Sequence, residues 1–257
     1  MKQLQVMRKS KSCSTQHKNF VNCRGTGVRY RYCERDNAES RIPYSVLQSN
    51  HSDDMNLKMH AFPELRFRLP GWVASVLPLT DHIFKDDEEK MRLAVMLAKE
   101  NVRHDTGGPF GAAVFDRKSG RLIAPGVNVV VPAHWSGGHA EMIAMALAQQ
   151  NLKTHDLGGE GMPFCELFTS VEPCAMCLGA IPWSGVRRVV CGARDEDARR
   201  VGFDEGPKPD NWIGELEQRD ISVTRDVLRD EADGVLQDYV EGGKPIYNAR
   251  QHRPDSS

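Results

Sequence analysis

The chain has 257 residues and a formal net charge of −1, and its hydrophobic and charged fractions, 40% and 27%, are typical of a globular protein. No run of about 18 apolar residues occurs, so the composition predicts no membrane span. Residues 1–50 hold 10 Lys and Arg against 3 Asp and Glu, which leaves 24 against 32 in the remainder. Because nucleic-acid affinity depends on basic side chains that neutralise phosphates, this acidic remainder argues against nucleic acid as a partner.

The amino-terminal part of the chain differs from the rest. Residues 1–54 are polar, basic and without helical or strand periodicity, which predicts a disordered tail. The cysteines of this tail lie ten residues apart, a spacing that fits no common metal site. A targeting arm is the other interpretation, since leaders rich in Arg and Ser and poor in acids have this composition. Residues 55–85 are interpreted as an extension that packs on the core, and residues 86–257 as the functional domain.

The cysteine content indicates the compartment. Seven cysteines make an odd number, two of them form a C-x-x-C spacing, and the chain begins without a secretory apolar region. We therefore expect a reducing, cytoplasmic compartment.

From Asp86 onward the sequence predicts alternating helices and strands. The acids at 86–89 suit the positive end of a helix dipole, apolar residues then recur at helical spacing, and Gly107 ends the helix. We predict a hairpin of strands 110–115 and 122–131, a helix over 140–150, a strand over 164–170, a helix that begins at Cys174, a strand over 188–191, a helix over 195–200, a strand over 221–227 and a helix over 229–240. This alternation predicts an α/β protein, a three-layer α/β/α fold with a mixed central sheet and helices on both faces.

Three side chains have the chemistry and spacing of a metal site. Cys174 and Cys177 lie three residues apart on one predicted helix, so both sulfurs share one face. The positive end of that helix favours thiolates, the form that binds metal. His139 would supply a third ligand from the start of its own helix. Three protein ligands leave one tetrahedral position open, as catalytic zinc sites do, and so predict one Zn²⁺ per chain.

Glu141 is the candidate catalytic residue beside these ligands. It follows His139 by two residues, too close to ligate the same ion comfortably, yet its side chain can reach a water at the open position. Two thiolates also neutralise the metal and acidify water less than histidines would, so a nearby base is needed. The alternative is a structural zinc site with Cys165 or Cys191 as fourth ligand, in which Glu141 is a solvated helix charge.

The paired motifs fit the H-x-E…P-C-x-x-C pattern of zinc deaminases, and the chain resembles the cytidine-deaminase-like superfamily, in particular its short zinc-dependent guanine deaminases. The resemblance spans about residues 91–250. The pattern alone suits cytidine, tRNA-adenosine and guanine deaminases equally, and Trp183 with Gly202-Phe203-Asp204-Glu205 favours the guanine branch. The segments that carry the resemblance are Gly107-Gly108-Pro109-Phe110-Gly111, Gly126-Val127-Asn128, His139-Ala140-Glu141 and Glu172-Pro173-Cys174-Ala175-Met176-Cys177-Leu178-Gly179-Ala180-Ile181.

The resemblance implies further site residues. Asn128 would hold the purine, and Glu205 would accept hydrogen bonds from guanine's amino or ring N–H groups. Phe110 could stack on the base or belong to the core, and Trp183 is interpreted as a packing or dimer contact. The family's carboxyl-terminal segment closes over a neighbouring site in a swapped dimer, which would make Tyr247 a substrate contact; a buried strand tyrosine is the alternative.

Together these features predict a homodimeric, zinc-dependent hydrolytic deaminase that converts guanine to xanthine and ammonia. Two alternatives remain open at this stage. One is a tRNA-adenosine deaminase that holds RNA with its basic tail, and the other is a non-catalytic, zinc-stabilised interaction module. The sequence leaves open whether guanine, another aminopurine, a triazine or a pterin is preferred.

Overall fold

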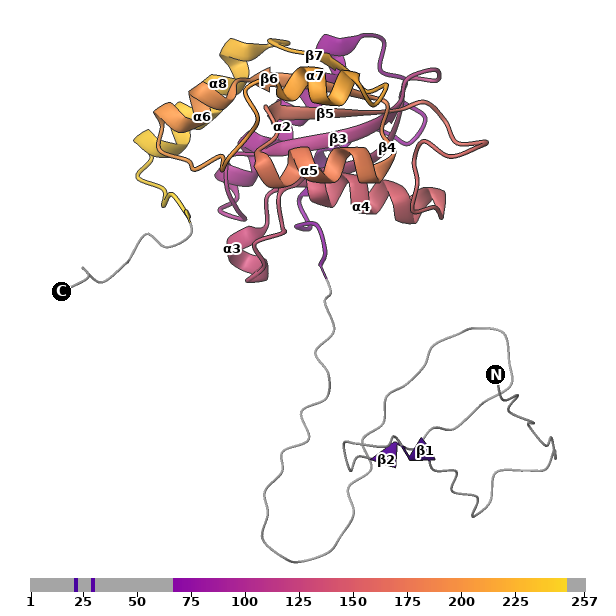
Figure 1. The fold of residues 1–257 in the computed structure, drawn as a ribbon. Coiled ribbons are helices and arrows are strands. Elements are labelled where there is room, and N and C mark those ends of the chain that lie inside the picture. The colour runs from indigo at the N-terminus through magenta and orange to yellow at the C-terminus, as the bar shows by residue number, and fades with distance from the viewer. Residues whose placement is uncertain (1–20, 23–28, 31–66, 249–257) are drawn as a thin grey trace, which may run out of the picture. The chain divides into compact units, whose positions relative to one another are not determined.

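The computed structural model describes residues 21–22, 29–30 and 67–248 (Figure 1). The chain divides into two compact units, residues 1–65 and 66–257. In the first unit, strands β1 (Val21–Asn22) and β2 (Arg29–Tyr30) form a short antiparallel pair where the sequence predicts no regular element. The rest of the predicted tail, with its three cysteines, lies outside the described residues. Within 67–248 every helix is too short or too polar to span a membrane.

The second unit is built on a five-stranded sheet with the order β4-β3-β5-β6-β7. Strand β3 pairs antiparallel with β4 and β5, whereas β5–β6 and β6–β7 are parallel, so the sheet is mixed as predicted. Every residue of β5 and β6 is buried, as expected for strands covered on both faces. The strands are β3 (Gly111–Asp116), β4 (Arg121–Val127), β5 (Cys165–Val171), β6 (Arg188–Ala193) and β7 (Ser222–Thr224).

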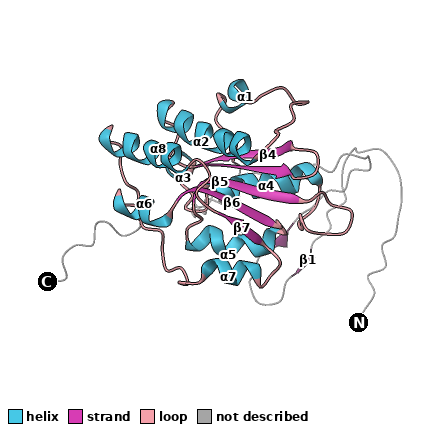
Figure 2. Ribbon diagram, turned by 90° about the horizontal axis from the view of Figure 1, so that it is seen from above, coloured by secondary structure: helices cyan, strands magenta, loops and turns pink. Residues whose placement is uncertain are grey.

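Helices cover both faces of this sheet, which confirms the three-layer prediction. Helices α2 (Asp87–Arg103) and α8 (Arg229–Glu241) bury their apolar residues in one core. Helices α4 (Ala140–Leu152), α5 (Ala175–Ser184) and α7 (Trp212–Glu217) contribute to a second core. Figure 2 shows α2 and α8 on one side of the strands and α5 and α7 on the other.

Two glycines let helices approach the sheet closely. A Cβ on Gly111 would lie 2.2 Å from the carbonyl oxygen of Ala94 in α2, and one on Gly126 would lie 2.1 Å from that of Ala140 in α4. Such distances are far below van der Waals contact, so any larger residue would push the helices away. Because Ala140 follows His139, the contact at Gly126 fixes the start of the helix that carries the candidate ligand.

The predicted hairpin is too long at its second strand. Strand β4 ends at Val127, and a short helix α3 (Val130–Ala133) occupies the predicted end. The cause is Asn128, whose Oδ1 accepts a hydrogen bond from Val130 N at 3.3 Å and so turns the chain out of the sheet. Strand β7 is likewise shorter than predicted. Helix α6 (Asp195–Arg200) matches its prediction, and α1 (Val73–Val76) and α7 are additional.

A buried ion-pair cluster joins α2 to the sheet. Glu166 on β5 is fully buried and accepts hydrogen bonds from Lys90 Nζ of α2 and from Arg188 Nη1 of β6. Arg188 also contacts Asp87 at the start of α2. The Arg188 hydrogen bond is the main reason that the pKa of Asp87 lies below its usual value. Each buried charge therefore has an opposite partner, the condition under which burial is tolerated.

Candidate metal and nucleobase site

Two helix starts bring the candidate ligands together. His139 is the residue before α4 and Cys174 the residue before α5, and both have extended backbones there. The ligand atoms of His139, Cys174 and Cys177 all lie within 4.8 Å of one another, and His139 Nδ1 is 3.5 Å from Cys174 Sγ. In the described part of the chain this is the one such group of three or more His, Cys, Asp or Glu side chains.

The donor set fits a zinc ion. Two sulfurs and one imidazole are the ligands that Zn²⁺ prefers. The hydrogen bond with Cys177 lowers the pKa of Cys174 to about 4, and His139 adds to this effect. The same hydrogen bond, with burial, raises the pKa of Cys177 well above its usual value. The pair thus places a thiolate beside a thiol, and a divalent cation that binds both sulfurs would displace the remaining proton.

Glu141 lies in the first turn of α4, only 7% exposed. Burial raises the pKa of its carboxyl, and the negative charge of Cys174 adds to the shift. Thr169 of β5 donates a hydrogen bond to Glu141 Oε1 at 3.3 Å, and no cation is among the hydrogen-bond partners of this carboxyl within the described residues. A buried carboxyl with a raised pKa holds a proton more readily than a solvated one, which suits a group that transfers protons.

Asn128 is 1% exposed, and the NH₂ of its side-chain amide has no hydrogen-bond partner among the described residues. Its Oδ1 accepts from Gly108 N at 3.4 Å and from Val130 N at 3.3 Å. Its Nδ2 has no hydrogen-bond partner, and no other buried side-chain nitrogen or oxygen of the described residues is in this state. Since buried polar groups are almost always paired, this donor calls for an acceptor from a ligand.

A backbone hydrogen bond holds Glu205 beside the candidate metal ligands. Its carbonyl oxygen accepts a hydrogen bond from Ala175 N at 2.9 Å, at the first turn of α5. The side chain is 6% exposed, and burial raises its pKa to about 8, with contributions from the charges of Cys174 and Glu141. No hydrogen bond to this carboxyl is made by the residues that the structure describes. Glu205 is therefore a second carboxyl, after Glu141, that forms no ion pair with a described residue.

Phe110 and Tyr247 meet at a third aromatic residue, Phe203. The ring centroids of Phe110 and Phe203 are 4.9 Å apart, and those of Phe203 and Tyr247 are 5.8 Å apart, both edge to face. The Tyr247 hydroxyl also packs against Gly108, where a Cβ would lie 2.4 Å from it. The roles of Phe110 and Tyr247 toward a base stay predictions.

The end of the described chain contacts the loop before Glu205. Asn248 Nδ2 donates to Gly202 O at 2.8 Å, and Asp204 N donates to Asn248 Oδ1 at 2.9 Å. This pair of hydrogen bonds satisfies backbone groups next to Glu205 without a second chain. The exchange of this segment between subunits stays a prediction.

Comparison with known proteins identifies the family. The cytidine and deoxycytidylate deaminase zinc-binding region matches residues 84–193. The guanine deaminase of Bacillus subtilis is 41% identical over 118 residues, which cover 46% of this chain and 71% of that protein. The chain belongs to the cytidine and deoxycytidylate deaminase family.

Two further relatives bear on the substrate of this deaminase. A solved structure of guanine deaminase from Nitrosomonas europaea is 47% identical with a TM-score of 0.64, covering 68% of this chain and 96% of that one. A tRNA-specific adenosine deaminase of Buchnera aphidicola is 30% identical, covering 52% of this chain and 80% of that protein. The protein is thus a zinc-binding hydrolase of C–N bonds that deaminates a nucleobase, which removes the alternative of a non-catalytic module.

Sequence reasoning missed Lys208. This residue follows Glu205 in the same loop and contacts the turn at Pro173 and Cys174, called here the cysteine turn. Its side chain is 7% exposed. Nζ donates to the carbonyl oxygen of Pro173, next to Cys174, at 3.1 Å, and lies 2.9 Å from Asp195 Oδ1 and 5.0 Å from the centre of the Trp212 ring. A lone lysine between prolines carries no local pattern, so only the fold reveals these contacts.

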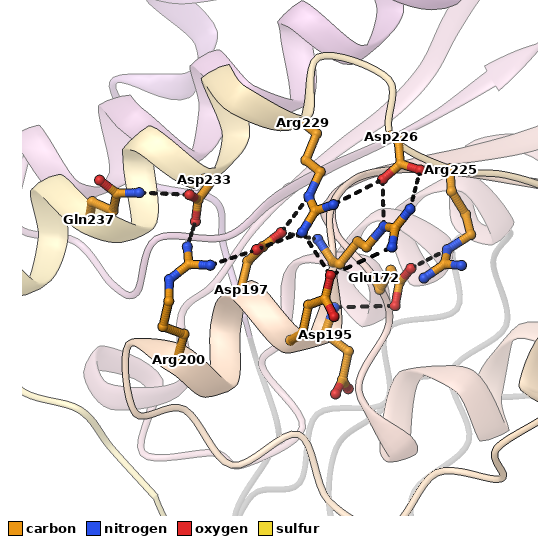
Figure 3. Close-up of polar contacts among 11 residues, drawn as sticks. Glu172, Asp195, Asp197, Arg200, Arg225, Asp226, Arg229, Asp233 and Gln237 are labelled. Atoms are coloured by element: carbon orange, nitrogen blue, oxygen red, sulfur yellow. Dashed lines mark hydrogen bonds and ion pairs between the residues drawn. The ribbon is translucent and has the colours of Figure 1, made fainter.

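A set of ion pairs holds the other side of the cysteine turn, as Figure 3 shows. Glu172, two residues before Cys174, accepts hydrogen bonds from Arg225 Nε and from Asp195 N. Asp197 of α6 is contacted by Arg200 and by Arg229 of α8. The hydrogen bond with Arg229 is the chief reason that the pKa of Asp197 falls to about 2. These contacts fix α6 and α8 against the strand that leads into the metal site.

The remaining described cysteines do not belong to this cluster. Cys165 and Cys191 lie fully buried on β5 and β6. Burial is the main cause that raises the pKa of both thiols, to about 11 for Cys165. They are core residues, and the alternative that either completes a four-ligand structural site finds no support in their positions.

Proposed function

We propose that this deaminase hydrolyses guanine to xanthine and ammonia. The observation that carries the proposal is the buried amide donor of Asn128, which has no partner among the described residues, together with the carboxyl of Glu205, which is 6% exposed. Guanine offers acceptors at N7 and O6 and donors at its ring N–H and amino group. A carboxyl keeps an acceptor oxygen in either protonation state, so Glu205 can receive the guanine donors while Asn128 donates to the acceptors.

We assign one zinc ion to His139, Cys174 and Cys177. When bound, this ion would supply Lewis-acid polarisation and make a water molecule a stronger nucleophile. Glu141 would accept the first proton of the attacking water and pass it to a ring nitrogen of the base, and would then carry the second proton to the departing amine. Water thus adds at the amino-bearing carbon, the C–N bond breaks, and ammonia leaves with the second proton. The raised pKa of Glu141 suits a group that must both take and give a proton.

The relatives named guanine deaminase support this substrate. The competing substrate is adenosine in tRNA, because relatives of this chain carry that name too. The excess of acidic residues after residue 50 speaks against it, since a tRNA-binding surface needs Lys and Arg to neutralise phosphates.

Ammonia release from a substrate panel tests the assignment. Guanine, adenine, 2,6-diaminopurine, melamine, a pterin, guanosine, cytidine and a tRNA anticodon stem-loop should be offered to the zinc-loaded protein at equal concentration. We expect the largest kcat/KM for guanine. Faster turnover of the stem-loop, lost on removal of residues 1–54, would establish the tRNA alternative instead.

A homodimer is also part of the proposal. Trp183 and Met176 lie seven residues apart on α5, hence on one helix face, and are 86% and 40% exposed. Trp183 is thus left uncovered by the described residues, which supports a role as a subunit contact. Light scattering should give twice the chain mass for the native protein and a lower value for Trp183→Ser; a monomeric native protein would contradict the dimer.

A further inference from the structure

We propose that a chain of hydrogen bonds from Trp72 through Thr106 and Asn101 positions Asn128, so that the segment 67–77 helps to set the affinity for the base. The inference rests on the proposed role of Asn128 as the donor to the base. It assigns positioning functions to residues that the zinc-deaminase motifs do not include, and Trp72 lies before the family match begins at residue 84.

The chain has a defined direction. Trp72 Nε1 donates to Thr106 Oγ1 at 2.9 Å, and the Thr106 hydroxyl donates onward to Asn101 Oδ1 at 2.8 Å. The indole can only donate, so it leaves the hydroxyl proton free to point toward Asn101. The amide oxygen of Asn101 is thereby occupied, and its NH₂ group must face the other way.

The Asn101 amide then holds the base-binding residue. Asn101 lies on α2 and is fully buried. Its Nδ2 donates to the carbonyl oxygen of Asn128 at 2.8 Å and to that of Gly108 at 2.9 Å. Gly108 N in turn donates to Asn128 Oδ1 at 3.4 Å. Both the backbone and the side-chain oxygen of Asn128 are therefore fixed through Asn101, which leaves only its Nδ2 for a ligand.

The close approach of the two loops requires small residues at their meeting point. A Cβ on Gly107 would lie 1.8 Å from the carbonyl oxygen of Asn128 and 2.8 Å from Asn101 Nδ2. The glycine therefore lets the loop and Asn128 share one amide donor. The sequence predicts that Gly107 ends the helix, but α2 ends at Arg103, and the structure gives Gly107 this close contact instead.

The segment 67–77 contacts the site at a second place. The Trp72 ring stacks on His104 with centroids 5.3 Å apart and planes 5° apart. Phe67 stacks on Trp135 with centroids 6.0 Å apart, in the loop between α3 and His139. Other apolar side chains of the segment pack on the main core, namely Leu69, Val76 and Leu77. The segment thus contacts both the loop between α2 and β3 and the loop between α3 and α4.

Removing the threonine hydroxyl should free the Asn101 amide to rotate. Any rotation weakens the hydrogen bonds that its NH₂ group donates to the carbonyl oxygens of Asn128 and Gly108. Asn128 would then lose its fixed position. Since Asn101 Oδ1 would then be a buried acceptor without this donor, we expect base affinity to fall by about tenfold. The kcat value should change far less, because His139 and Glu141 are held by other contacts.

Thr106→Val, Thr106→Ser and Trp72→Phe test the inference. Val matches threonine in shape but lacks the hydroxyl, Ser keeps the hydroxyl, and Phe keeps the ring stack but lacks the N–H. Each is compared with the native protein for zinc content, melting temperature, kcat and KM, and, in a Glu141→Gln background that does not turn over the base, for the Kd of guanine.

We expect KM and Kd to rise about tenfold in Thr106→Val, by a smaller factor in Trp72→Phe, and to stay near native in Thr106→Ser, with zinc content unchanged. An unchanged Kd in both Thr106→Val and Trp72→Phe would overturn the inference. So would a lower melting temperature without any change in Kd, which is the result of a merely structural role. If the native protein deaminates another base but not guanine, the proposed substrate is wrong, and the same variants are measured with that base.

Discussion

The protein buries carboxyl groups in two regions, which differ in whether the carboxyl forms an ion pair. In the cluster between α2 and the sheet, Glu166 is fully buried between Lys90 and Arg188. At the metal and nucleobase site, Glu141 and Glu205 are nearly as buried but have no cation against them among the described residues. Burial of a charge without a partner is costly. The comparison supports a division of roles in which the paired carboxylate stabilises the fold and the carboxyls without an ion pair act on the substrate, as we propose.

The largest expected effect is loss of the metal. Cys174→Ala removes one of three proposed ligands, so purified protein should lose its single zinc ion and all measurable turnover. Cys165→Ala is the matched control, because it removes a buried strand cysteine outside the cluster. Metal analysis by mass spectrometry checks both, and full zinc occupancy in Cys174→Ala would refute the ligand assignment.

Glu141→Gln should give the next largest effect. Glutamine keeps the size of the side chain but cannot carry a proton, so kcat should fall by about 10² to 10⁴ while zinc stays bound. Steady-state ammonia release and zinc content, measured on one preparation, test this. A near-native kcat would show that an unpaired buried carboxyl at this site is not the proton carrier.

Glu166→Gln tests the other half of the comparison. The change leaves Lys90 without a charge partner in the interior, and breaking such a buried pair costs about 3–5 kcal/mol of unfolding free energy. The exposed pair Glu88–Arg92 provides the control, and Glu88→Gln should cost less than about 1 kcal/mol. Denaturant unfolding measures both, and the folded Glu166→Gln protein should keep its kcat. A loss of kcat at native stability would reverse the assignment of roles.

Glu205→Gln should shift specificity rather than abolish catalysis. Its amide turns part of an acceptor into a donor that faces guanine's own N–H groups, which should lower the guanine-to-adenine ratio of kcat/KM by about tenfold. Zinc content should not change. An unaltered ratio would remove Glu205 from the base-binding wall.

The smallest effect is expected at the amino terminus. Residues 1–54 lack the apolar content to join a core. Their removal should change kcat and KM by less than about twofold and the melting temperature by no more than about a few degrees. A deletion that extends through Trp72 should instead raise KM, since it cuts the hydrogen-bond chain to Asn128. Equal behaviour of the two truncated proteins would deny residues 55–72 any part in base binding.

What the sequence reveals about this protein depends on how local the signal is. The ligands and Glu141 stand in two short motifs at helix starts, and the helices that carry them are predicted within a few residues because capping and periodicity are local. Lys208 and Asn101 escaped notice because their partners lie far away in the chain. The end of β4 was misplaced because the hydrogen bond that Val130 N donates to Asn128 Oδ1 overrides the strand preference of three valines. The domain boundaries remain predictions.

The central claim is that the unpaired groups of Asn128 and Glu205 select guanine. Calorimetric titration of zinc-loaded Glu141→Gln with guanine and with adenine tests it most directly, because binding is then measured without turnover. The account predicts that guanine binds at least about tenfold more tightly, with a preference that shrinks when Glu205→Gln is added. Equal affinity for the two bases, or tighter binding of adenine, would contradict it.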